Sequence, residues 1–150
     1  VGNWTVESFF RFSDKDKTAQ SILSGRPDYR WGIYYNSDGN RHMEIYLSSN
    51  NFSWNIISGN PQGTKTDYIN GQWYHIALVF NGANYKLYVD GVLDLTVVSS
   101  TSVYGDSSGM YIGIWGNLGF NCFAGWIDET RVSKGIARWT SNFTPPTIEY

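Results

Sequence analysis

Cysteine, histidine and charged residues are all scarce in this chain of 150 residues. The one cysteine, Cys122, cannot form an internal disulfide, so packing must stabilise the fold. A single cysteine also does not indicate whether the protein works in an oxidising or a reducing compartment. The two histidines are far apart and, with a single thiol, have no zinc-ligand spacing. We expect His75 to be a hydrogen-bonded core residue and His42 to be solvated. No G-x-S-x-G nucleophile elbow occurs, so a serine hydrolase of that type is excluded.

Charged residues make up only 16% of the chain, against roughly 25% in ordinary soluble domains. The formal net charge of -2 gives no electrostatic reason to bind nucleic acid or an anionic membrane. No apolar run approaches the roughly 20 residues that span a bilayer, and no signal-peptide pattern opens the chain. We therefore expect no nucleic-acid partner and no membrane insertion.

Aromatic residues are abundant, at 17%, and most of them lie in segments where apolar and polar residues alternate. Turn residues break this period-two pattern about every ten positions, which indicates an antiparallel sandwich or barrel. Asp38-Gly39 and Asp90-Gly91 mark two hairpins. Residues 73–80 are apolar on both faces and should form a central strand. The predicted strands are Trp4–Phe12, Trp31–Tyr35, Met43–Leu47, Trp73–Phe80, Tyr85–Val89, Val92–Val97, Tyr111–Trp115 and Gly125–Val132.

The only predicted helix is a single turn at residues 134–138, too short to be stable without packing. The chain length fits one all-β domain covering residues 1–150. Because the N-terminal segment begins within a strand pattern, we expect this domain to be part of, or excised from, a longer protein.

Six segments resemble, in their order and spacing, a laminin G-like domain of the concanavalin A-like lectin/glucanase superfamily. They are WTVESFFRF, WGIYY, QWYHIALVF, LYVDGV, YIG and FAGWIDETRVSKGIARWTSNFTPP. The closing segment especially resembles domains of bacteriophage and marine bacterial surface proteins, often found in tandem. The resemblance implies a jelly-roll sandwich of two antiparallel sheets, one of them concave, with ligands bound in the concavity or at its rim loops. It also implies an extracellular, cell-surface or virion-associated location and a role in adhesion.

One feature departs from the family pattern. Family members usually carry a further strand upstream of the WTVESFF segment, and this chain begins too late to supply it. Either residues 146–150 or another chain covers that sheet edge, or the edge stays open for pairing. An open edge could pair with a second copy of this chain to form a homo-oligomer.

Aromatic rings beside flexible glycines suggest a site for a ligand with flat apolar faces, such as a sugar. Rings would stack on the sugar, while Asn and Arg side chains hydrogen-bond its hydroxyls. The alternative is that these rings cap the ends of the core. The candidate carbohydrate-binding residues are Arg26, Tyr29, Trp31, Trp54, Tyr68, Trp115, Asn117, Phe120 and Asn121.

Catalysis has weaker support, because the E-x-D-x-x-E pattern of glycosidases in this superfamily is absent. Asp128 and Glu129 are adjacent and point to opposite faces of a strand, whereas retaining chemistry needs two carboxyls about 5–5.5 Å apart. Glu7 and Glu44 could converge only from separate strands. No catalytic residue is assigned.

The resemblance also implies a possible calcium site, since laminin G-like and related lectin domains often bind Ca²⁺ through loop carboxylates and backbone carbonyls. Asp38, Asp67 and Asp106 are loop candidates, but each is equally explained as a turn former. We assign no metal ligand and expect no required cofactor, with Ca²⁺ as an option.

These observations favour a non-catalytic carbohydrate-binding, lectin-like module that recognises a glycan. Two alternatives remain open: a structural or protein-interaction module on the same sandwich, and a glycoside hydrolase.

Overall fold

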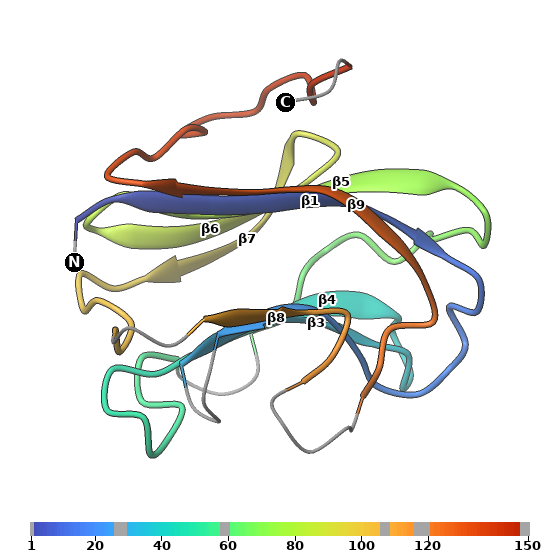
Figure 1. The fold of residues 1–150 in the computed structure, drawn as a ribbon, viewed down its shortest axis with the longest axis horizontal. Helices are drawn as coiled ribbons and strands as arrows, with labels where there is room; N and C mark the ends of the chain where they lie inside the picture. The colour runs from blue at the N-terminus through green and yellow to red at the C-terminus, as the bar shows by residue number, and fades with distance from the viewer. Residues whose placement is uncertain (1, 26–29, 58–60, 106–108, 116–120, 148–150) are drawn as a thin grey trace.

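The computed structural model describes residues 2–25, 30–57, 61–105, 109–115 and 121–147. Across these residues the chain forms nine strands in two antiparallel sheets stacked face to face (Figure 1). The five-stranded sheet has the order β7-β6-β5-β1-β9, and the four-stranded sheet has the order β4-β3-β2-β8. The strands are β1 Trp4–Phe12, β2 Gln20–Gly25, β3 Trp31–Asn36, β4 His42–Leu47, β5 Trp73–Phe80, β6 Asn84–Val89, β7 Val92–Val98, β8 Met110–Ile112 and β9 Gly125–Lys134. The predicted all-β sandwich is confirmed.

The core lies between the two sheets and is rich in aromatic side chains. Alternation in β1 directs Trp4, Val6, Phe10 and Phe12 into it, as predicted. Phe10 and Phe12 meet edge to face with ring centroids 5.4 Å apart, a favoured aromatic geometry. Facing residues of the four-stranded sheet include Ile33, Tyr35, Met43, Ile45 and Leu47.

No helix in the described ranges is long and apolar enough to cross a membrane.

The hairpin predicted at Asp90-Gly91 joins β6 to β7. Both residues have positive φ, 50° and 76°, as a two-residue type I′ turn requires. Gly91 has a second constraint, because a Cβ there would lie 1.8 Å from the backbone oxygen of Phe143. The turn is therefore packed directly against the C-terminal part of the chain.

The secondary structure differs from the prediction in three places. Strand β2 was missed because all six of its residues are buried, so it has no alternation of buried and exposed positions to detect. The helical turn at residues 134–138 does not form. Gly135 has φ 84°, and the hydroxyl of Thr5 donates to the Ile136 carbonyl and accepts from the Arg138 N–H. These bonds to β1 replace the bonds that a helix would need. The strand predicted at residues 111–115 is shorter, because Gly113 has φ 72° just after β8.

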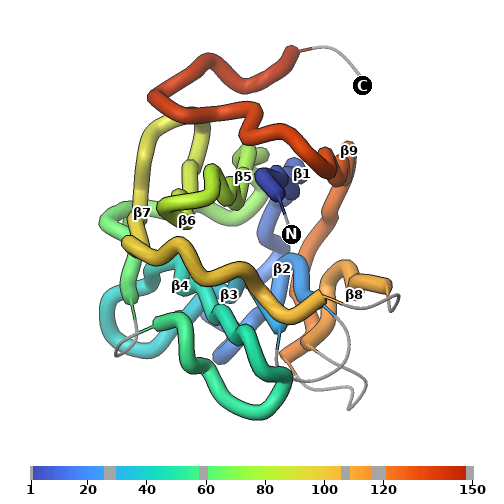
Figure 2. Tube along the Cα trace, turned by 90° about the vertical axis from the view of Figure 1, so that its left-hand side faces the viewer, coloured from blue at the N-terminus to red at the C-terminus, as the bar shows by residue number. Residues whose placement is uncertain are grey.

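Residues 135–147 cross the outer face of the five-stranded sheet, on the side away from the four-stranded sheet (Figures 1 and 2). Trp139 and Phe143 stack with centroids 3.9 Å apart and pack against Ala77, Val79 and Tyr88. Strand β5 is thus covered on both faces, which confirms the central strand expected from its apolar sequence.

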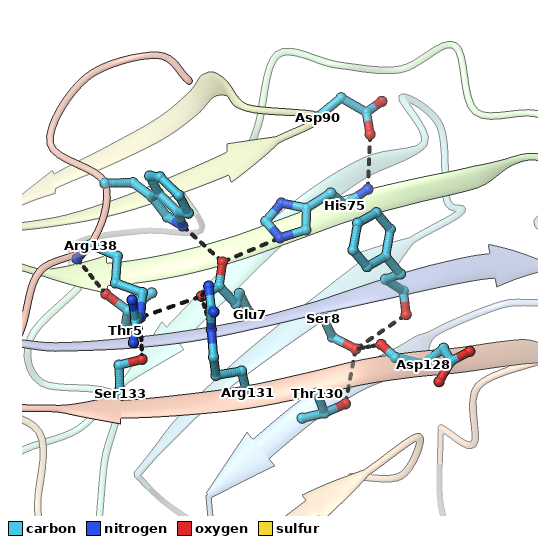
Figure 3. A network of polar contacts seen from close by, with 12 residues as sticks. Thr5, Glu7, Ser8, His75, Asp90, Asp128, Thr130, Arg131, Ser133 and Arg138 are labelled. Carbon is cyan, nitrogen blue, oxygen red and sulfur yellow. Dashed lines mark hydrogen bonds and ion pairs between the residues drawn. The ribbon is translucent and has the colours of Figure 1, made fainter. Parts of the chain in front are cut away.

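A buried carboxylate fixes this C-terminal segment to the sheet (Figure 3). Glu7 has no exposed surface. Its Oε1 accepts two hydrogen bonds from Arg131, at 2.6 and 2.8 Å, and its Oε2 accepts one from the indole N–H of Trp139 at 2.8 Å. The Nε2 atom of His75, which is buried as predicted, lies 3.3 Å from Oε2. Strands β1, β5 and β9 and the C-terminal segment therefore meet at one side chain.

The free edge of β9 has no paired strand among the described residues. The described C-terminal residues lie over a sheet face and not along this edge, and residues 148–150 fall outside the described ranges. Cover of this edge by residues 146–150 therefore stays a prediction.

We predict that Glu7→Gln lowers the free energy of unfolding by about 3 kcal/mol, because it leaves Arg131 beside a neutral group in a buried network. Urea unfolding followed by tryptophan fluorescence at pH 7 measures this loss. Asp67→Asn is the matched control: Asp67 pairs with Lys65 at the exposed surface, so its loss should leave the urea unfolding midpoint nearly unchanged.

The same variant should change the pH dependence of stability. Burial alone would raise the pKa of Glu7, but hydrogen bonds from His75, Trp139 and Arg131 outweigh it and hold the pKa below the ordinary 4.5. The ionised form therefore stabilises the fold fully above pH 4.5, and this contribution disappears as pH falls through the lowered pKa. The gap between wild type and Glu7→Gln should narrow in acid, and a gap that is constant with pH would contradict this account.

Candidate functional site

The outer face of the four-stranded sheet collects polar and aromatic side chains from β3 and β4. Because Ile33, Tyr35, Met43, Ile45 and Leu47 point into the core, the alternate positions of both strands point outward. Cross-strand pairing places these outward residues opposite one another. The pairs are Gly32 with Tyr46, Tyr34 with Glu44, and Asn36 with His42.

Four aromatic rings gather at one end of this face, and we call them the four-ring cluster: Tyr34, Tyr46, Trp54 and Trp115. Trp115 lies directly over Gly32, where a Cβ would come within 2.3 Å of its indole. Its ring centroid is 5.4 to 5.7 Å from those of the other three rings. Each ring keeps part of its surface exposed. The absence of a side chain at position 32 therefore makes the space that the indole fills.

Trp54 reaches the cluster from a compact loop, residues 48–57, on the outer side of the same sheet (Figures 1 and 2). The side-chain oxygen of Asn50 accepts hydrogen bonds from the N–H groups of Phe52 and Ser53, both at 3.0 Å. The oxygen of Asn55 accepts from the Ser49 N–H at 2.8 Å. Such side-chain to backbone bonds stabilise tight turns, so the loop holds Trp54 against Tyr46, with centroids 5.3 Å apart.

A buried carboxylate lies beside the rings. Glu44 is 1% exposed and accepts hydrogen bonds from Nε2 of His42 at 2.9 Å, the hydroxyl of Tyr46 at 2.7 Å and the amide of Asn36 at 3.2 Å. His42 is itself buried, so the prediction that it is solvated was wrong. Its hydrogen bond to Glu44, two residues later on the same face of β4, holds the imidazole against the sheet. Glu44 thereby fixes the orientation of Tyr46 and is a positioning residue.

Both tyrosines of the cluster remain protonated at neutral pH. Burial, followed by the charges of Glu44 and Asp38, raises the pKa of Tyr34 to about 12. Burial, followed by the hydrogen bond to Glu44, also raises the pKa of Tyr46. The cluster therefore presents neutral rings, two of which carry hydroxyl groups.

The structure divides the predicted site residues. It brings Trp54 and Trp115 together in the four-ring cluster. Tyr68 is 3% exposed and packs in the core against Phe10, Phe12, Tyr35 and Tyr74, so its prediction as a ligand residue is corrected: no sugar can reach that ring. Asn121 is half-buried, and its carbonyl accepts from the Ser21 N–H at 2.8 Å. Arg26, Tyr29, Asn117 and Phe120 lie outside the described residues.

Trp31 belongs to a different place. It is the first residue of β3, faces the inner side and packs near Trp4, with centroids 6.0 Å apart. Both rings line a hollow of about 680 Å³ between the sheet edges, together with Val6, Met110 and Val132. The hollow is lined mainly by apolar side chains, with Arg30, Tyr104 and Lys134 also on its wall. Of the predicted site residues that the structure describes, it holds Trp31, whereas the four-ring cluster brings two together. We therefore prefer the four-ring cluster as the functional site.

The carboxylates considered for catalysis are on opposite sides of the molecule. Glu7, Asp128 and Glu129 belong to the five-stranded sheet, and Glu7 is buried beneath the C-terminal segment. Glu44 belongs to the four-stranded sheet and faces outward from it. Glu7 and Glu44 therefore cannot converge as an acid–nucleophile pair.

Sequence reasoning missed Tyr34 and Tyr46 as site residues and treated Glu44 only as a carboxylate. The signal was present in MEIYL and WGIYY, whose alternation places these three side chains opposite the core residues. The prediction concentrated on loops, whereas half of the cluster comes from strands.

A family model for a laminin G-like domain, described as the concanavalin A-like lectin/glucanases superfamily, matches residues 1–138. The chain belongs to this superfamily. The resemblance found in the sequence motifs is thus confirmed, while the bacteriophage or marine bacterial setting stays a prediction. A search of curated proteins finds no match.

Three solved structures illustrate the likeness of this superfamily member to others. A candidate carbohydrate-binding protein from Bacteroides ovatus has a TM-score of 0.69 and 20% identity, over 91% of this chain and 38% of that protein. Domain 4 of AbnA, a GH43 extracellular arabinanase from Geobacillus stearothermophilus in complex with arabinotriose, has a TM-score of 0.61 and 22% identity, over 88% of this chain and 61% of that one. A SAP-like pentraxin from Limulus polyphemus has a TM-score of 0.59 and 18% identity, over 88% of this chain and 64% of that one. The chain spans less than two thirds of each, and at these identities the likeness shows the fold alone.

We predict that Gly32→Ala displaces the Trp115 ring, because the new methyl group would overlap its indole. The expected cost is about 1–3 kcal/mol of unfolding free energy, as for other overpacked sites, with a changed near-ultraviolet circular dichroism spectrum from the altered ring contacts. Gly109→Ala is the control, since a Cβ there meets nothing within 4 Å. An unchanged spectrum for Gly32→Ala would show that Trp115 does not rest on this position.

Proposed function

We propose that this domain is a non-catalytic carbohydrate-binding module and that it binds a glycan at the four-ring cluster. The observation that carries the proposal is the set of four partly exposed rings held around the buried Glu44 on an outer sheet face. Rings of this kind stack on the C–H faces of a sugar, and each such contact contributes about 0.5–1.5 kcal/mol if it resembles an aromatic pair.

The surrounding polar groups suit orientation of a sugar. Tyr34 and Tyr46 remain neutral and carry hydroxyl groups, and Asn36 lies on the same face. Because the hydroxyl of Tyr46 donates to Glu44, its oxygen is left to accept a hydrogen bond from a saccharide hydroxyl. The rings of the cluster are pre-positioned by Gly32, Glu44 and the loop of residues 48–57, so little ordering should be needed on binding.

The relatives support a saccharide ligand by analogy. One is a candidate carbohydrate-binding protein and another was solved in complex with arabinotriose. Non-catalytic binding is proposed because the carboxylate of the cluster, Glu44, is engaged with three donors, while the other acidic candidates belong to the opposite sheet. A glycoside hydrolase would need a second carboxyl near the first.

We further propose that binding does not require calcium. In the described ranges, no group of three or more His, Cys, Asp or Glu side chains could hold a metal ion. Asp67 is paired with Lys65 at 2.6 Å, and Asp106 lies outside the described residues. Ca²⁺ bound through loop carbonyls is the alternative, and it is tested by the chelator arm of the experiment below.

The setting of the domain is also a proposal. An extracellular, cell-surface or virion-associated position would give it access to glycans and a role in adhesion. A shallow site binds weakly alone, so tandem copies or a homo-oligomer through the free edge of β9 would raise avidity through effective concentration. Sedimentation equilibrium would reveal such self-association.

We predict that Trp54→Ala lowers glycan affinity about tenfold, the equivalent of roughly 1.4 kcal/mol for a lost stacking ring. A glycan array first selects an oligosaccharide, and isothermal titration calorimetry with that oligosaccharide, with and without EDTA, then measures the affinity of each variant. Phe52→Ala is the matched control: Phe52 lies in the same loop and is 83% exposed, but it is outside the four-ring cluster.

Two outcomes would contradict the proposal. Absence of any saccharide binding, with and without calcium, would favour the structural or protein-interaction module. In that case the packing of the four rings against one another would be enough to explain the cluster. Equal affinities for Trp54→Ala and Phe52→Ala would place the glycan elsewhere on the molecule.

A further inference from the structure

A second group of aromatic residues lies on the opposite outer face, that of the five-stranded sheet. Arg11 of β1 pairs across the sheet with Trp73 of β5 on one side and with Trp126 of β9 on the other. The three side chains form a row, which we call the tryptophan–arginine row. The guanidinium carbon of Arg11 is 5.0 Å from the Trp73 ring centroid and 4.2 Å from that of Trp126. The cation is therefore flanked by two indoles.

The row is open to solvent. Trp73 is 41% exposed and Trp126 is 51% exposed, which is high for residues that usually pack inside. The described C-terminal segment covers the other end of this face, over Glu7, Ala77 and Val79. Since neighbouring strands are about 4.8 Å apart, the row is roughly 10 Å long. A patch of that length can contact more than one sugar ring.

The charge of Arg11 has no counterpart in the described part of the chain. Neither a carboxylate within ion-pair distance nor a hydrogen-bond acceptor for its guanidinium occurs among those residues, and its buried Nε has no partner there. Two other guanidinium groups of this face, on Arg131 and Arg138, lie 2.6 and 3.9 Å from the carboxylate of Glu7. Arg11 is also only partly exposed, and a partly desolvated cation attracts an anion more strongly than one in water.

We propose that the tryptophan–arginine row is a binding site for an acidic saccharide, one that carries a carboxylate or a sulfate group. Indole faces stack on sugar rings, as at the four-ring cluster, and the guanidinium supplies what that cluster lacks. An arginine whose faces contact aromatic rings still has its N–H edge free, and this planar edge matches the oxygens of carboxylate and sulfate groups. The row therefore selects for charge as well as for shape.

The test uses polymers matched in pairs. Polygalacturonate is compared with its carboxyl-reduced form, and dextran sulfate with dextran, by isothermal titration calorimetry on the whole chain. We expect the wild-type protein to bind at least one acidic polymer about tenfold more tightly than its neutral partner, since charge-assisted hydrogen bonds are the stronger ones. The two pairs distinguish a carboxylate from a sulfate as the preferred group.

Variants locate the site. Arg11→Gln should abolish the preference for the acidic polymer, Arg11→Lys should restore only part of it because the planar edge is lost, and Trp126→Ala should weaken binding to both members of the pair. Thermal unfolding verifies that each variant is folded. Trp54→Ala, in the four-ring cluster of the opposite face, should leave the preference for the acidic over the neutral polymer unchanged, so a failure of the proposed function and a failure of this inference remain distinguishable.

Three results would overturn the inference. The first is wild-type protein that binds none of the acidic polymers, and the second is equal affinity for the acidic and neutral members of both pairs. The third is an Arg11→Gln variant that is folded and still prefers the acidic polymer, which would show that the charge is read by another part of the surface.

Discussion

The burial of an ionised carboxylate at Glu7 is the constraint on which the arrangement of the five-stranded sheet depends. A buried charge is costly unless donors surround it, and here the donors come from β9, from β5 and from the C-terminal segment. Satisfying Glu7 therefore requires the segment that carries Trp139 to lie across the sheet. Once they do, Trp139 and Phe143 cover β5, and the apolar outer surface of a central strand is removed from water.

The two outer faces of the sandwich solve the same problem differently. Each carries one buried glutamate, and each glutamate accepts several hydrogen bonds. On the five-stranded sheet the partners include Trp139 of the C-terminal segment, which covers one end of this face. On the four-stranded sheet the partners are His42, Tyr46 and Asn36 of the sheet itself, so the rings above it stay partly exposed. The covered part of the five-stranded sheet contributes stability, while the four-ring cluster on one face and the tryptophan–arginine row on the other remain partly exposed.

Local patterns were enough to predict most of the fold. The alternation in β1, the apolar run of β5 and the Asp-Gly turn between β6 and β7 are all dictated by nearby residues, and all were identified. Strand β2 was not, because burial on both faces removes the alternation that marks a strand. The false helical turn has a long-range cause, since the Thr5 side chain, distant in sequence, captures the backbone of residues 136 and 138.

The site was less predictable for the same physical reason. Trp54 and Trp115 could be named from their loops, but their neighbours Tyr34 and Tyr46 are set by strand register and by the missing side chain at Gly32. Tyr68 could not be told from a rim residue by sequence, because its burial depends on rings from three other strands. A candidate list drawn from loops thus captures only the part of a site that loops supply.

The packing of Gly91 against the C-terminal segment has a consequence for how this hairpin can vary. A type I′ turn taken alone accepts asparagine as well as glycine, because both adopt a positive φ. Here the carbonyl oxygen of Phe143 occupies the space that a Cβ at position 91 would need. The backbone N–H of Phe143 also donates to the Gly91 carbonyl at 2.9 Å. An Asn-Asn or similar turn that suits an isolated hairpin would therefore displace the C-terminal segment from the sheet. This short surface turn thus packs together two parts of the chain that are distant in sequence.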